Sequence, residues 1–260
     1  MRRFVLVLLA IPLISGCGGV DGSLFATAVR NTQAAGGAEV AFQWNYEIPG
    51  QDRPVVMYGS GFEDVSKRHA SIKAQLPEEA PGGGEIELIA DERVMYMRAP
   101  FIQAALGGKE WMKLDLARLD ESLGLEGGAL GQMGQGSADQ LEALAELSDG
   151  VEDEGREVVR GTEATHYSAV VDFDKLPGEK LQRLAKLSGG SEVDVDVWID
   201  DAQRIRRMEW DQQLAEGGMR MKMIMEYVRF GVPVDIDTPD DGDVFDATDL
   251  TTQALQQELN

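Results

Sequence analysis

Residues 40–48 read VAFQWNYEI, and this stretch decides the class of fold. Apolar and polar residues alternate along it, so that one face of an extended chain would carry Val40, Phe42, Trp44, Tyr46 and Ile48. A period of two is typical of a β-strand with one buried face, and the Pro49-Gly50 pair ends the pattern. From Gly37 onward, the chain is therefore expected to form β-structure.

The same alternation recurs along the rest of the chain at spacings typical of antiparallel neighbours. Ten further strands are predicted at residues 55–61, 68–76, 85–90, 93–98, 110–115, 151–159, 164–171, 192–199, 204–214 and 219–230. A sheet of about eleven antiparallel strands does not stay flat, so it should curl into a half-open barrel. No linker composition divides it, which indicates a single α+β domain.

Three short helices are predicted, each with one apolar stripe that should lie against the concave face of the barrel. The first covers residues 24–31. The second follows a capping box at Ser137, carries Leu141 and Leu144, and ends near Gly150. The third begins after Pro177 and ends at residues 189–190.

The first residues have the three parts of an export signal. Arg2 and Arg3 precede an apolar run that is too short to span a bilayer, and ISGC at residues 14–17 resembles the lipobox of bacterial lipoproteins. Cleavage before Cys17 would remove residues 1–16 and leave a diacylglyceryl cysteine, followed by a short tether at residues 17–22. The domain would then span residues 23–247, and residues 248–260 would form a tail, either a docked helix or a frayed end.

Composition excludes several classes of function. A formal charge of -22 opposes binding to nucleic acid or to anionic lipid surfaces. One Cys and two His are too few for a structural zinc site or a disulfide framework, so no cofactor is expected. His166 has no nucleophile-elbow serine, and we expect no enzyme. The acidic residues 235–243 do not fit an EF-hand loop, which leaves weak calcium binding or a solvated acidic segment.

Methionine and aromatic residues gather where a cavity lining would lie. Met219, Met221, Met223 and Met225 alternate along one predicted strand, and flexible Met suits ligands of variable shape, although plain core packing explains the stripe equally well. Further lining candidates on other strands are Trp44, Tyr46, Met95, Tyr96, Met97 and Trp111. Two apolar loops either guard the entrance of such a cavity or simply pack onto the end of the barrel. The candidate entrance residues in these loops are Phe101, Ile102, Leu106, Leu125, Leu130 and Met133.

Several motifs together resemble the LppX/LprG-type lipoproteins of actinobacteria, which share the fold of the LolA and LolB lipoprotein carriers. They are the lipobox, VMYM at residues 94–97, KEWMKLD at 109–115, GTEATHY at 161–167, VDVWID at 195–200 with RIRR at 204–207, and FGVPVDI at 230–236. The resemblance implies a membrane-anchored protein on the extracytoplasmic face that binds acyl chains of a lipid, glycolipid or lipoprotein for transport across the envelope. The alternative it leaves open is a sensor or adaptor that engages a membrane protein without carrying lipid. The implied partners are thus a lipid, the membrane and an envelope protein.

Overall fold

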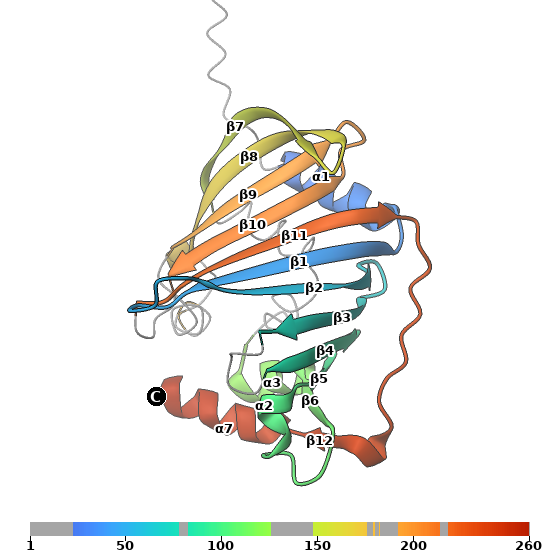
Figure 1. Cartoon of the computed structure of the whole chain (residues 1–260), viewed down its shortest axis with the longest axis vertical. Coiled ribbons are helices and arrows are strands. Elements are labelled where there is room, and N and C mark those ends of the chain that lie inside the picture. Colours follow the sequence, from blue (N-terminus) through green and yellow to red (C-terminus); the bar gives the residue numbers. More distant parts are fainter. Residues whose placement is uncertain are drawn as a thin grey trace, which may run out of the picture.

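The computed structural model describes residues 23–77, 83–125, 148–175, 179, 182, 192–213 and 218–259. Its centre is one 12-stranded sheet with the spatial order β12-β6-β5-β4-β3-β2-β1-β11-β10-β9-β8-β7 (Figure 1). The strands are β1 (Ala38–Glu47), β2 (Val55–Asp64), β3 (His69–Leu76), β4 (Gly84–Asp91), β5 (Val94–Arg98), β6 (Trp111–Asp115), β7 (Ser148–Val159), β8 (Thr162–Asp172), β9 (Glu192–Asp200), β10 (Ile205–Gln213), β11 (Arg220–Phe230) and β12 (Val244–Asp246). In the described part of the chain the two edge strands, β7 and β12, do not pair with each other, so the sheet is open. The half-open α+β architecture predicted from the alternation is confirmed.

The sheet consists of two antiparallel meanders joined along one seam. Strands β1 to β6 each pair with the next in sequence, strands β7 to β11 do the same, and β1 pairs with β11 to unite them. These eleven strands correspond to the eleven predicted ones. The twelfth was missed: β12 has three residues and pairs in parallel with β6.

Two of the described helices were predicted and two were not. α1 (Ser23–Ala34) contains the predicted helix at residues 24–31, and α7 (Thr248–Leu259) shows that the tail is helical; it packs against α3 (Leu116–Leu123). α3 and the short α2 (Pro100–Gln103) were not expected. The prediction that a helix ends near Gly150 is wrong, because β7 already begins at Ser148. The rest of that helix, and the one after Pro177 apart from residues 179 and 182, lie outside the described residues.

Short 3-10 turns connect some of the strands. η2 (Phe173–Lys175) follows β8, and η3 (Asp241–Asp243) precedes β12. Residues 231–243 run along the side of the molecule from β11 in the middle of the sheet to β12 at its edge (Figure 1). No helix among the described residues is long and apolar enough to span a membrane.

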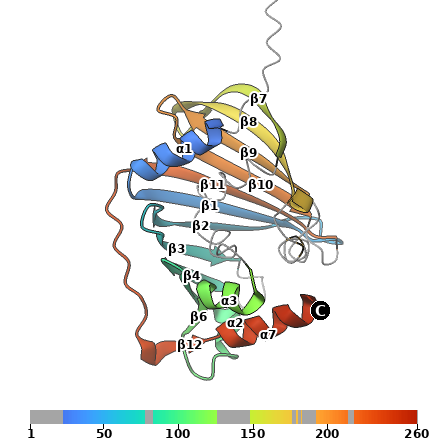
Figure 2. The same ribbon diagram turned by 180° about the vertical axis from the view of Figure 1, so that it is seen from behind.

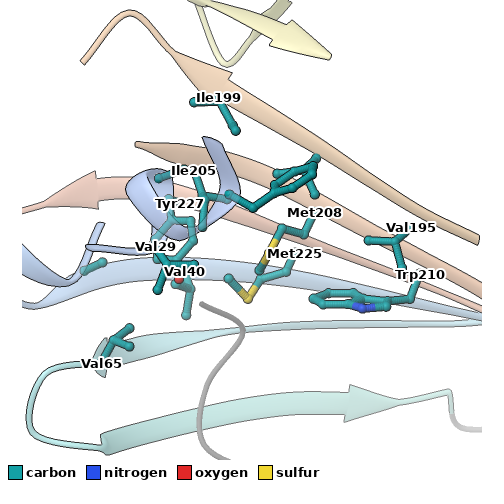
Figure 3. Close-up of a cluster of buried hydrophobic side chains, with 14 of the residues drawn as sticks. Val29, Val40, Val65, Val195, Ile199, Ile205, Met208, Trp210, Met225 and Tyr227 are labelled. Atoms are coloured by element: carbon teal, nitrogen blue, oxygen red, sulfur yellow. The ribbon is translucent and has the colours of Figure 1, made fainter. Parts of the chain in front are cut away.

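The main core lies between α1 and one face of the sheet. α1 crosses this face near β9, β10 and β11 (Figure 2) and buries Phe25, Ala28 and Val29 in it. The Thr32 hydroxyl fixes the helix in place, since its Oγ1 donates to the Ala28 carbonyl at 2.7 Å and accepts the Ile205 amide at 3.0 Å. Figure 3 shows Val29 of this helix beside Val40, Ile205 and Tyr227 of the strands.

A pair of glycines bends the sheet between β2 and β3. A side chain at Gly61 would place its Cβ 2.1 Å from the Ser71 carbonyl oxygen, and one at Gly59 would lie 2.8 Å from the Lys73 carbonyl oxygen. The backbone of β3 thus crosses space that a Cβ on β2 would occupy. Glycine inside a strand commonly marks such a close approach of two backbones. The sheet is curved in this region, since residues of β3 to β5 line the same cavity as residues of β10 and β11.

Candidate functional site

The register of the ladders gives the sheet one apolar face. In β1, Phe42 stands opposite Met225 of β11, and Met225 stands opposite Met208 of β10. The next layer on the same face joins Trp44, Met223 and Trp210. Because directly paired residues point to the same side of a sheet, the methionine stripe and the alternating residues of β1 form a single surface. It is the concave face, which α1 covers in part.

A cavity of about 180 Å³ lies on this face beyond the cover of α1. It reaches from the centre of the sheet at β10, β11 and β1 to the bent edge at β3, β4 and β5, and Leu116 at the start of α3 also reaches it. Its lining residues are Phe42, Glu63, Asp64, Val65, Arg68, His69, Ala70, Ile72, Leu88, Ile89, Ala90, Glu92, Met95, Leu116, Trp210, Met223 and Met225. Most of this lining is apolar, which makes the cavity a site for hydrocarbon.

Three of the predicted lining residues reach the cavity: Met95, Met223 and Met225. Four others share the concave face and lie outside the cavity lining, namely Trp44, Tyr46, Met97 and Met221. Burial disfavours the tyrosinate form of Tyr46 and raises its pKa, as expected for a phenol packed among apolar groups. Met219 precedes β11 and is not part of its stripe.

Two predicted lining residues are on the wrong face. Tyr96 lies opposite Lys113 in the β5–β6 ladder, whereas Met95 lies opposite Leu114, so the ladder assigns Tyr96 to the convex side. Trp111 alternates with Met112 and joins the same convex side, where the Arg98 guanidinium stands 5.1 Å from its ring. A cation–π contact with a half-exposed arginine explains why an indole is stable on the outer face.

The four predicted entrance residues that the structure describes are not among the residues lining the cavity. Leu106 is buried in the turn after α2, while Phe101 is more than half exposed to solvent. Ile102 and Leu125 are half-buried and also lie away from the lining. These four residues are thus absent from the cavity lining, and whether the loop at residues 99–106 guards an entrance or packs onto the end of the sheet stays a prediction. Leu130 and Met133 lie outside the described residues.

Sequence reasoning missed the polar part of the lining and several apolar members. Ile72 and Leu88 alternate within predicted strands, so their faces could have been assigned only with the register of β3 and β4. Glu63 lies near the end of β2, whereas Arg68 and Glu92 lie in two turns more than twenty residues apart in the chain. No local pattern joins these residues.

The convex face is dominated by paired charges. Glu209 is buried between Lys222, at 2.5 Å, and Arg207. Glu87 contacts Lys73 and receives a hydrogen bond from Arg98 at 2.6 Å. Burial opposes ionisation of Glu87, but the hydrogen bonds from its two cationic partners outweigh it and lower the pKa of the carboxyl group. These charged side chains favour contact of the convex face with water over contact with an apolar ligand.

His166 belongs to the convex face as well. Its Nε2 lies 2.7 Å from Asp196 Oδ1, and its ring stacks on Trp198 with 4.1 Å between ring centroids. The Ser168 hydroxyl donates to Glu154 Oε1 at 2.6 Å and so does not serve as a nucleophile held by His166. These contacts account for His166 as part of the packing of β8 on β9.

The acidic segment at residues 235–243 is where weak calcium binding was predicted as one alternative. Among the residues that the structure describes, no group of three or more His, Cys, Asp or Glu side chains is arranged to hold a metal ion. Asp240 contributes its carbonyl to the turn that leads into β12, where it accepts the Asp243 amide at 2.8 Å.

No protein-family model matches the chain. A relative from Streptomyces griseus, described as an uncharacterized 31.2 kDa protein in the rplA-rplJ intergenic region, is 27 % identical over 188 residues, which cover 67 % of this chain and 61 % of the relative. The chain therefore spans less than two thirds of that protein.

Solved structures similar to this chain include two mycobacterial proteins, LprF and the lipoprotein LppX. LprF from Mycobacterium bovis is 15 % identical with a TM-score of 0.47, and the match covers 85 % of this chain and 99 % of LprF. LppX from Mycobacterium tuberculosis is 14 % identical with a TM-score of 0.49, and the match covers 84 % of this chain and 100 % of LppX. Similarity of this degree leaves the function to be argued from the cavity itself.

Proposed function

We propose that the protein is a lipid-binding lipoprotein that takes acyl chains into the cavity on the concave face of its sheet. The observation that carries this proposal is the cavity between the bent edge and the methionine stripe, whose walls are mainly Ile, Leu, Val, Met and aromatic side chains. Such a surface gains free energy when hydrocarbon replaces water on it, by about 25 cal/mol for each Å² of apolar area removed from water.

The lining is suited to chains of varying length. A volume of 180 Å³ is below the roughly 300–1,000 Å³ typical of pockets that enclose a drug-sized ligand, so a long acyl chain requires the walls to separate. Met95, Met223 and Met225 have unbranched, flexible side chains that can change rotamer as the cavity fills.

The proposal places the protein on the extracytoplasmic face of the cell membrane. Its support is the sequence ISGC at residues 14–17 after a basic start and a short apolar run. Two acyl chains on Cys17 would anchor the protein stably, since each buried methylene contributes about 0.8 kcal/mol. A lipid held close to the membrane could then be passed to an envelope protein, and this transfer is the transport function that we propose.

The proposal is tested by native mass spectrometry with solvent extraction. Residues 18–260, which contain every described element, are produced in the cytoplasm so that any lipid found is cargo and not the anchor. We expect acylated species at close to one per chain. A protein that stays free of lipid, also after incubation with envelope lipids of a native host, would contradict lipid binding and favour the adaptor function.

The anchor is tested separately by replacing its only possible attachment point. The Cys17→Ser variant of the full chain should lose incorporation of labelled palmitate and move from the membrane fraction to the soluble extracytoplasmic fraction. Retention of the label in this variant would contradict lipidation at Cys17, with no bearing on the cavity.

A further inference from the structure

The cavity has an open end and a deep end. Arg68 and Glu92 line it and are exposed, so the cavity meets solvent at the turns that follow β2 and β4. At the other end the lining residues Phe42, Trp210 and Met225 are at most 8 % exposed. A hydrocarbon chain that enters between the two turns therefore advances along the strands toward these three residues.

Two small residues lie next to the path of such a chain. On the concave face, Gly59 is the position after Gly61 along β2 as the strand runs away from the turn, and Ala74 is the position after Ile72 along β3. Ile72 lines the cavity, whereas Gly59 and Ala74 do not. Ala74 is nevertheless only 4 % exposed, so another side chain covers the space that these two small residues leave.

The indole of Trp44 fills this space. A Cβ built on Gly59 would lie 3.1 Å from Trp44 Cζ3 and 3.1 Å from the Ala74 Cβ, so the ring of Trp44 reaches from β1 across β2 to the edge of β3. The ring stacks on Phe42, with 5.4 Å between the ring centroids and 9° between the planes. In the β1–β11 ladder, Trp44 stands opposite the lining residue Met223. The indole thus closes the deep end of the cavity on the side of β2 and β3.

The concave face stays apolar beyond the indole. Met57 stands opposite Trp44 in β2, and Tyr46 and Met221 form the next pair on this face toward the far end of β1 and β11. All three side chains are half-buried. A chain that passes the indole therefore continues over apolar side chains, where each further methylene removed from water gains free energy.

The volume of the cavity sets the length of chain that fits while the indole stays in place. A dry cavity of about 150 Å³ holds one benzene molecule. The 180 Å³ of this cavity therefore hold about seven carbon atoms. A myristoyl chain, with fourteen carbons, is about twice that long.

We propose, on the basis of the lipid-binding function above, that Trp44 determines the length of acyl chain that the cavity accepts. Chains of up to about seven carbons fill the cavity with the indole in place. A longer chain binds only when the indole turns away from Gly59 and Ala74, and the free energy of this movement is subtracted from the gain of the added methylenes.

Alkyl maltosides of increasing length test this role, because they share one uncharged head and differ only in the chain. Hexyl, octyl, decyl and dodecyl maltoside are titrated below their micelle concentrations, in a calorimeter, into residues 18–260 freed of bound lipid. In the wild type each methylene up to octyl should tighten binding about fourfold, and each methylene beyond octyl less than about twofold. Trp44→Ala should keep about fourfold for each methylene up to dodecyl, so that its ratio of dodecyl to octyl affinity exceeds that of the wild type by at least about tenfold.

Trp111→Ala is the matched control, since it removes a half-buried indole from the convex face and should leave the dependence on chain length as in the wild type. An unchanged dependence in Trp44→Ala, or the same change in Trp111→Ala, overturns the role of Trp44 and leaves lipid binding intact. No binding of any maltoside by the wild type overturns the lipid-binding function as well.

A second variant keeps the test decisive if Trp44→Ala does not fold. Trp44→Phe retains an aromatic ring stacked on Phe42, and the phenyl ring is smaller than the indole. It must therefore move the chain length at which the gain per methylene falls from octyl to decyl. A fall that stays at octyl in this variant overturns the proposal.

Discussion

Replacing Gly61 by alanine tests whether the bend of the sheet depends on the missing side chain. The new Cβ would lie 2.1 Å from the Ser71 carbonyl oxygen and 2.8 Å from Ile72 Cα, both backbone atoms of β3. Ordinary contact begins at 3.4 Å, so β3 would have to move by about 1.3 Å relative to β2. A rotamer change cannot relieve this overlap because no side-chain atom is involved.

The magnitude follows from two opposing effects. Overpacking of a well-packed site costs about 1–3 kcal/mol, while replacing glycine by alanine restricts the unfolded chain and returns about 0.4–1 kcal/mol. We therefore expect the free energy of unfolding to fall by about 1–2 kcal/mol. For a domain of this size that corresponds to a decrease in Tm of roughly 2–8 °C.

Urea unfolding followed by circular dichroism measures this change, and the chain supplies a matched control. Gly150 lies in β7 with an ordinary φ, and a Cβ built there meets nothing within 4 Å. Gly150→Ala should be neutral or slightly stabilising. If Gly61→Ala unfolds at the same urea concentration as the wild type, the bend does not depend on glycine and the reasoning is refuted.

Three further substitutions test the cavity, the convex face and the seat of α1. Met223→Asp puts a carboxylate into the apolar lining and should weaken lipid retention in native mass spectrometry by at least about tenfold, whereas Met219→Asp, outside β11, should retain lipid; equal retention by both would exclude Met223 from the site. Glu87→Gln should lower the free energy of unfolding by about 1–3 kcal/mol at pH 7. Because the pKa of Glu87 is lowered in the folded state, this difference is complete above its ordinary pKa of 4.5 and is lost as the pH falls through the folded-state value. A difference that does not change with pH would contradict the ion-pair origin. Thr32→Val leaves the Ile205 amide without its partner and should cost about 1–3 kcal/mol in urea unfolding, and an unchanged midpoint would show that water or backbone replaces the hydroxyl.

The sequence predicted the strands well because their alternation is local. The pattern at residues 40–48 correctly put Phe42 and Trp44 on one face, and the methionine stripe identified the matching face of β11. In β5, the alternation of residues alone did not show which side chains face the concave side, because Met95 and Tyr96 are both apolar enough to be buried. The register with β6 decides this, and it depends on pairing between separate parts of the chain.

The site was harder to predict than the sheet. The predicted strand at residues 55–61 ended at Gly61, yet β2 continues to Asp64. The parallel pairing of β12 with β6 involves only three residues and has no hairpin signal. The turns at Arg68 and Glu92 are brought together by contacts across the ladder, which single-sequence patterns do not contain.

The seam between β1 and β11 determines when the fold can be completed. Each meander consists of neighbouring strands and can begin to form soon after its own residues are available, but β1 finds its partner only when β11, at Arg220–Phe230, has emerged. Such distant pairing is slow, because the entropy of closing the long intervening loop is lost before any contact compensates for it. During this delay the apolar faces of both meanders stay uncovered and prone to aggregation. If the chain is exported as proposed, β1 and β11 would pair only after export, and the rate of maturation would depend on how fast this seam closes.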